Sequence, residues 1–159
     1  MKIINLLILF VFIGLAACSE DDAAQIPNDK SSLLQTGQGE FNDVLDDIKK
    51  GEKTSDSFTI FAVKVENNIL LIDVGYAGGC ETHEFELIWP EVIITIYPYQ
   101  FGVILNHNAN GDLCEAFIKE TLSYDLTDNP LGLNDQSIQD MKITIINGSD
   151  PDNAVSNRE

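Results

Sequence analysis

The stretch FTIFAVKVENNILLIDV, residues 58–74, decides the fold class of this chain. Its apolar residues do not follow the spacing of a helix but a period near two, which is typical of β-strands. Asn67 and Asn68 separate the two halves, and asparagine is a common turn former. The stretch therefore predicts one strand from Phe58 to Val65 and a second from Ile69 to Val74.

The same pattern continues towards the C-terminus. Five further strands are predicted, at His83–Trp89, Val92–Tyr97, Phe101–Asn106, Ala116–Leu126 and Met141–Asn147. The breaks between them contain the turn formers Gly78-Gly79, Pro90, Pro98 and Asn110-Gly111. About seven short strands with turns between them predict an all-β domain, an antiparallel immunoglobulin-like sandwich.

One short N-terminal helix is expected before the first strand. In FNDVLDDIKKG the apolar residues Phe41, Val44, Leu45 and Ile48 share one helical face, and Gly51 follows two lysines at a position where helices end. The folded domain is therefore predicted at 40–148. The remaining residues, 149–159, are expected to form a disordered tail.

The chain begins with MKIINLLILFVFIGLAACSEDD, in which Lys2 precedes an apolar run from Ile3 to Leu15. This run is shorter than the ~20 apolar residues that span a bilayer, and it has the form of a secretory signal. Leu15-Ala16-Ala17-Cys18 resembles a bacterial lipobox. The resemblance implies a signal peptide over 1–17 that is removed, with lipid chains attached to Cys18.

The residues after Cys18, from Ser19 to Asp22, are mostly acidic. They resemble the export signal of surface-exposed lipoproteins of the Bacteroidota, which implies an outer-membrane, lipid-anchored protein at the cell surface. This resemblance ends at about residue 22 and implies a location but no activity. Residues 18–39 contain few large apolar side chains and are expected to form a flexible acidic tether.

The formal net charge of −17 narrows the classes of partner. A strongly acidic chain does not suit nucleic acid, because affinity for nucleic acid depends on neutralising phosphates. The charge favours solubility instead. The membrane is the partner implied by the lipid anchor, whereas a protein or glycan partner is left unspecified, and no cofactor is predicted.

Two cysteines and two histidines are expected to meet at one end of the sandwich. Strand parity places His83 and His107 on the core side at strand ends, close in sequence to Cys80 and Cys114. A Cys80–Cys114 disulfide is the favoured interpretation, since an exported protein meets an oxidising environment. A Cys₂His₂ zinc site is the second interpretation. In the third, the disulfide forms while His83 and His107, with Glu81 or Asp112, bind a metal or small ligand.

The segment NHNANGD, residues 106–112, imitates the opening of a calcium-binding EF-hand loop. Its charged ligands are replaced by amides, and Phe117 stands where the loop needs a glutamate. Asn110-Gly111 is instead a strong signal for a hairpin turn. Because motifs for nucleophiles, zinc proteases and phosphate loops are absent from the sequence, no catalytic residues are predicted. The expected function is a non-catalytic binding or envelope-associated module. The alternative is a metal or small-ligand binding protein that uses His83 and His107.

Overall fold

The computed structural model describes residues 31–35, 38–52, 55–90, 96–127, 129 and 131–159. The predicted signal peptide, Cys18 and the first part of the tether lie outside these residues. The strands are β1 (Ser31–Gln35), β2 (Phe58–Glu66), β3 (Ile69–Gly78), β4 (Glu84–Trp89), β5 (Gln100–Asn108), β6 (Ala116–Asp125), β7 (Lys142–Asn147) and β8 (Asp150–Ser156). The helices are α1 (Gln38–Lys50) and α2 (Asp135–Asp140).

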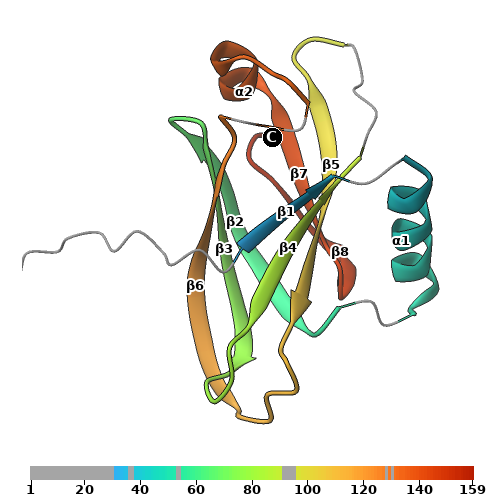
Figure 1. The fold of residues 1–159 in the computed structure, drawn as a ribbon, viewed down its shortest axis with the longest axis vertical. Coiled ribbons are helices and arrows are strands. Elements are labelled where there is room, and N and C mark those ends of the chain that lie inside the picture. The colour runs from blue at the N-terminus through green and yellow to red at the C-terminus, as the bar shows by residue number, and fades with distance from the viewer. Residues whose placement is uncertain (1–30, 36–37, 53–54, 91–95, 128, 130) are drawn as a thin grey trace, which may run out of the picture.

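The strands form two sheets, so the prediction of a mainly β, two-sheet domain is confirmed (Figure 1). One sheet has the order β1-β4-β5-β7-β8 and the other β2-β3-β6. The prediction of a wholly antiparallel sandwich is wrong, because β1 pairs with β4 and β5 pairs with β7 in parallel. A parallel pair needs a long crossover connection, and the chain reaches β7 only after β6 and α2.

The core lies between the two sheets. Alternate residues of β4 and β5 point into it, including Leu87, Val103 and Leu105, each with no exposed surface. The opposite parity of the same strands carries Ile88 and Ile104, which pack against Phe41 and Ile48 of α1. The domain therefore has three layers, with α1 on the face of the larger sheet that is turned away from the smaller one (Figure 1).

Helix α1 ends where the sequence predicts. Gly51 follows Lys50 with a φ of 77°, a left-handed conformation that glycine adopts without a steric penalty. Its N–H donates to the carbonyl of Ile48 at 3.0 Å. The helix begins at Gln38, inside the segment predicted as tether.

Three other predictions are wrong or partly untested. The expected disordered tail 149–159 contains β8, which pairs with β7. The expected tether contains β1, which pairs with β4. Ile96 and Tyr97, the end of the strand predicted at Val92–Tyr97, form a bend, while 91–95 lie outside the described residues.

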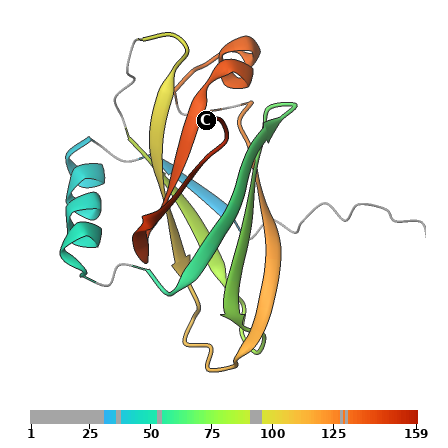
Figure 2. The same ribbon diagram turned by 180° about the vertical axis from the view of Figure 1, so that it is seen from behind.

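Strand β8 is polar, and side-chain amides explain why it is nevertheless ordered. Asn153 accepts a hydrogen bond from the N–H of Ile60 at 2.8 Å and donates to the Ile60 carbonyl at 3.3 Å. Asn147, which is fully buried, donates to the carbonyl of Phe58 and to Asn153. These amides join β2 to the larger sheet, and the two ribbon views show the path of β8 in that sheet (Figures 1 and 2). In the described part of the chain, no helix has the length and apolar character needed to cross a membrane.

Candidate functional site

The predicted disulfide is present at one end of the sandwich. Cys80, after β3, and Cys114, before β6, are joined with their Cα atoms 5.9 Å apart. Within the described residues, the one group with the spacing of metal ligands consists of these two cysteines and Asp112. Because both sulfurs are used in the disulfide, the structure does not support the Cys₂His₂ zinc interpretation.

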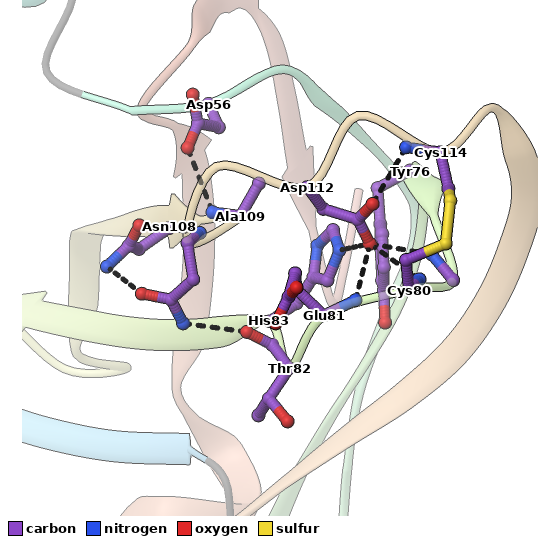
Figure 3. Close-up of polar contacts among 12 residues, drawn as sticks. Asp56, Tyr76, Cys80, Glu81, Thr82, His83, Asn108, Ala109, Asp112 and Cys114 are labelled. Atoms are coloured by element: carbon purple, nitrogen blue, oxygen red, sulfur yellow. Dashed lines mark hydrogen bonds and ion pairs between the residues drawn. A yellow bond between two sulfur atoms is a disulfide. The ribbon is translucent and has the colours of Figure 1, made fainter.

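Asp112 is the centre of the same region (Figure 3). Its Oδ2 accepts hydrogen bonds from the N–H groups of Gly79, Cys80 and Glu81 at 2.8–2.9 Å, and its Oδ1 accepts one from the N–H of Cys114 at 2.8 Å. The side chain has no exposed surface. These donors, with that of Glu81 contributing most, hold the pKa of the Asp112 carboxyl well below its ordinary value because they favour the charged form.

The two histidines continue this network into the core. His83 Nε2 lies 3.1 Å from Asp112 Oδ2, and His83 Nδ1 lies 2.8 Å from His107 Nε2. His107 Nδ1 lies 3.4 Å from the carbonyl oxygen of Asp56. The prediction that the histidines lie close together on the core side is confirmed, and both residues are at most 5% exposed. Each of the four ring nitrogens therefore lies within 3.4 Å of a polar atom of the protein.

The carboxylate fixes the direction of this chain of hydrogen bonds. Because ionised Asp112 can only accept, His83 Nε2 must carry a proton. If both rings are neutral, His83 Nδ1 accepts from His107 Nε2, and His107 Nδ1 then has no proton to donate to the Asp56 carbonyl. All three contacts are hydrogen bonds only when the pair holds one further proton. Burial lowers the pKa of His107 and is the largest effect; the contact with the Asp56 carbonyl opposes this shift, and the neighbouring His83 adds a smaller lowering.

This depressed pKa predicts acid sensitivity between pH 8 and pH 5. The unfolded chain takes up a proton at His107 near its ordinary pKa of about 6.5, whereas the folded protein does so only at lower pH. The contribution of His107 to stability is therefore complete above about pH 6.5 and is lost as the pH falls below it. Thermal unfolding should show a smaller loss between pH 8 and pH 5 for His107→Gln than for wild type. An equal loss in both proteins would contradict the assignment.

Aromatic rings fill the space around the histidines. Tyr76 stacks on His83 with ring centroids 4.5 Å apart, and Phe85 stacks on His107 at 4.4 Å. The Tyr76 hydroxyl donates to Glu120 at 2.6 Å, and burial together with this carboxylate raises the pKa of Tyr76. The histidines are thus packed as core residues, with no open coordination position facing solvent.

The predicted ligand set is only partly assembled. His83, His107 and Asp112 meet, whereas Glu81 contributes its backbone N–H and its residue is exposed. Sequence reasoning missed Asp56, whose carbonyl faces His107 and whose carboxylate accepts from the N–H of Ala109 at 2.8 Å. No pattern in the sequence points to Asp56, because it is distant in sequence from the segments that it contacts.

Gly78 was predicted as a turn residue, but it is the last residue of β3, where it pairs with Ala116. A Cβ at this position would overlap His83 Nε2 and would lie 3.1 Å from Asp112 Oδ2. Glycine is therefore required for the close approach of His83 to Asp112. The Gly-Gly pair in the sequence is a signal for this contact that could have been recognised.

The segment with the calcium-like pattern is a turn between the two sheets. Asn110 and Gly111 both have positive φ, at 51° and 76°, as a turn of the predicted type requires. The hairpin prediction is nevertheless wrong, because β5 and β6 belong to different sheets. The Asn110 side chain donates to the carbonyl of Thr82 at 2.7 Å and accepts from Asn108 at 3.1 Å. The hydrogen bond to Thr82 joins the turn after β5 to the segment before β4.

The fold and this region define a three-layer, mainly β domain whose loop end is closed by a disulfide and by buried polar groups. We refer to Cys80, Cys114, Asp112, His83 and His107 as the end clamp. No known family matches the chain, and no curated protein matches it.

Three solved structures are similar to the chain. A protein of unknown function, DUF1344, from Bacteroides vulgatus has 10% sequence identity and a TM-score of 0.49, and the match covers 79% of this chain. A candidate toxin-related protein from Parabacteroides distasonis has 17% identity and a TM-score of 0.46, with 79% of this chain covered. A candidate lipoprotein from Bacteroides fragilis has 14% identity and a TM-score of 0.46, with 73% of this chain covered. The matched regions span 54%, 57% and 59% of those chains.

Proposed function

We propose that the protein is an outer-membrane lipoprotein whose folded domain acts as a non-catalytic binding module of the cell envelope. The observation that carries the non-catalytic part is the state of the end clamp. Its histidines and carboxylate are the residues best suited to chemistry, yet each of their ring nitrogens and carboxylate oxygens faces a polar group of the protein within 3.4 Å. A general base or metal ligand must reach its substrate or ion, whereas both histidine rings are buried.

The lipid anchor rests on Leu15-Ala16-Ala17-Cys18 and the acidic residues that follow. Together they support an outer-membrane location with the domain on the outside of the cell. The five residues of β1 begin 13 positions after Cys18, so the tether between anchor and domain is short.

The anchor is tested by Cys18→Ala. The variant is expected to lose membrane attachment or to keep its signal peptide, because the lipid has no attachment site. Fractionation of cells and intact-protein mass spectrometry measure both results, with Cys80→Ala as the control that should remain in the membrane fraction. A Cys18→Ala protein of mature mass in the outer membrane would contradict the proposal.

The structural role of the end clamp is tested by metal titration. A ligand that binds only the folded state raises the unfolding temperature. Zinc, copper and calcium are expected to leave thermal unfolding of the full-length protein unchanged, in wild type and in His83→Gln alike. Stabilisation of wild type that is absent from His83→Gln would instead identify the histidines as a metal site.

A further inference from the structure

The outer face of the three-stranded sheet carries a group of side chains that the end clamp does not use. On β3, Ile72 and Val74 point into the core, so Asp73 and Gly75 between and beside them point outwards. Lys119 and Thr121 of β6 lie opposite Gly75 and Asp73 in the pairing of the two strands. No described helix or strand covers this face (Figures 1 and 2).

Gly75 makes room for two aromatic rings on this face. A Cβ at Gly75 would lie 2.6 Å from Cε2 of Phe61 and 2.8 Å from Cζ of Phe117, which is closer than contact allows. Both rings therefore occupy the space above the Gly75 backbone that a side chain at this position would fill. They remain exposed, Phe61 by 48% and Phe117 by 64%. Neighbouring exposed rings form an apolar patch, and contiguous apolar patches are features of interaction sites.

A hollow of about 320 Å³ lies beside the Phe61 ring, a volume within the range of small-ligand sites. Its lining residues are Phe61, Asp73, Val74, Lys119, Glu120 and Thr121. The Thr121 hydroxyl donates to Asp73 Oδ1 at 2.7 Å and so orients the carboxylate. Lys119 Nζ lies 5.1 Å from the centre of the Phe61 ring, where the ring attracts its charge.

We propose that this hollow binds a neutral pyranose sugar of a glycan. A pyranose presents an apolar C–H face together with a rim of hydroxyl groups. The Phe61 ring provides an apolar surface for the C–H face, while Asp73 accepts and Lys119 donates hydrogen bonds to hydroxyls. The inference rests on the proposed function as a binding module, and it names the ligand class and the surface.

Other ligand classes fit the hollow less well. An added peptide strand pairs at the edge of a sheet, whereas the hollow lies on the face of this sheet, over β3, which is paired on both sides. An anionic glycan would be repelled by the net charge of −17, and the hollow contains a single lysine to attract it. A purely apolar ligand would desolvate the charged groups of Asp73 and Lys119 without offering them hydrogen bonds, which costs free energy.

Calorimetric titration of the full-length protein in detergent tests the proposal. The probes are neutral hexasaccharides of glucose, mannose and galactose, with hexagalacturonate as the charged analogue of the last. At least one neutral sugar is expected to bind, and more tightly than hexagalacturonate. Phe61→Ala should weaken that binding about tenfold, since it removes the aromatic contact. Asp73→Asn should also weaken it, because the amide replaces one acceptor by a donor.

Leu113→Ala is the matched control, because Leu113 is an exposed apolar residue on a loop outside the hollow. This variant should bind as wild type does, and the unfolding temperature of each variant shows whether it is folded. The proposal is overturned if no neutral hexasaccharide binds, if folded Phe61→Ala binds as tightly as wild type, or if hexagalacturonate binds best. Such a result would leave the membrane fractionation of wild type and Cys18→Ala unchanged, so a failure of this inference is distinguishable from a failure of the anchor.

Discussion

Replacing both half-cystines, by Cys80→Ser with Cys114→Ser, is expected to destabilise the folded protein by about 4 kcal/mol. The disulfide closes a loop with a sequence separation of 34 residues, and on the chain-entropy account a loop of this size stabilises by about that amount. The loop contains β4 and β5, which lie in the other sheet from β3 and β6. In the folded protein, the crosslink joins the two ends of the segment that leaves the three-stranded sheet and returns to it. In the unfolded chain, it restricts the conformations of the same segment. Denaturant unfolding followed by circular dichroism measures the loss.

The matched control is wild-type protein unfolded in the presence of a dithiol reductant. It should lose the same stability as the double serine variant, because both lack the crosslink and keep every other contact. The reductant should have no effect on the variant. A difference of less than about 1 kcal/mol between oxidised wild type and the variant would contradict the chain-entropy account for this loop.

Asp112→Asn is expected to cause the second large loss of stability, although the two side chains have nearly the same shape. Asp112 Oδ2 accepts from three backbone N–H groups and from His83. An asparagine that keeps its carbonyl oxygen at this position places its NH₂ group at Oδ1, which accepts from the N–H of Cys114. In either orientation, therefore, donors face donors, and buried polar groups lose their partners.

The pH dependence of this loss has a defined sign. The pKa of Asp112 is lower in the folded protein than in the unfolded chain, where it is about 3.9. Its contribution to stability is therefore complete above about pH 4 and is lost as the pH falls towards the folded value. Wild type should lose more stability than Asp112→Asn between pH 5 and pH 2.5. The difference between the two proteins is thus largest near neutral pH.

Asp125→Asn provides a matched control on the surface. Asp125 also has a lowered pKa, but it caps a single backbone N–H, that of Thr127, and its residue is exposed. When both variants are unfolded with urea and followed by circular dichroism, Asp125→Asn should lose much less stability than Asp112→Asn. Equal losses would show that the number of donors and the burial of Asp112 do not matter.

The sequence by itself determined the local elements. Residues 58–74 form two strands joined at Asn67 and Asn68, both with positive φ, as paired turn formers predict. The spacing of Phe41 and Ile48 identifies the buried face of α1. The parity of β4 and β5 places His83 and His107 towards the core. These features could be predicted because each depends on residues that are close in sequence, where side-chain period and turn chemistry act directly.

The sequence also favoured the disulfide that the structure contains, because Cys80 and Cys114 remain as a pair if Cys18 carries a lipid as predicted. It placed the two histidines near this disulfide without revealing their purpose. Whether a histidine binds a metal or packs in the core depends on the groups that face its ring nitrogens. Those groups include the carbonyl of Asp56, which is 51 residues from His107 in sequence.

Only the tertiary structure decided which strands pair. The polar sequence of β8 predicted a tail, yet Asn147 and Asn153 bind the backbone of β2 and hold it in place. Asn110-Gly111 forms a turn as predicted, but the strands on either side of it belong to different sheets. Strand β5 pairs with β4 and β7, whereas β6 pairs with β3. The hollow beside Phe61 depends in the same way on Gly75 and on β6. Strand pairing is settled by contacts between distant segments, which local period and turn signals do not encode.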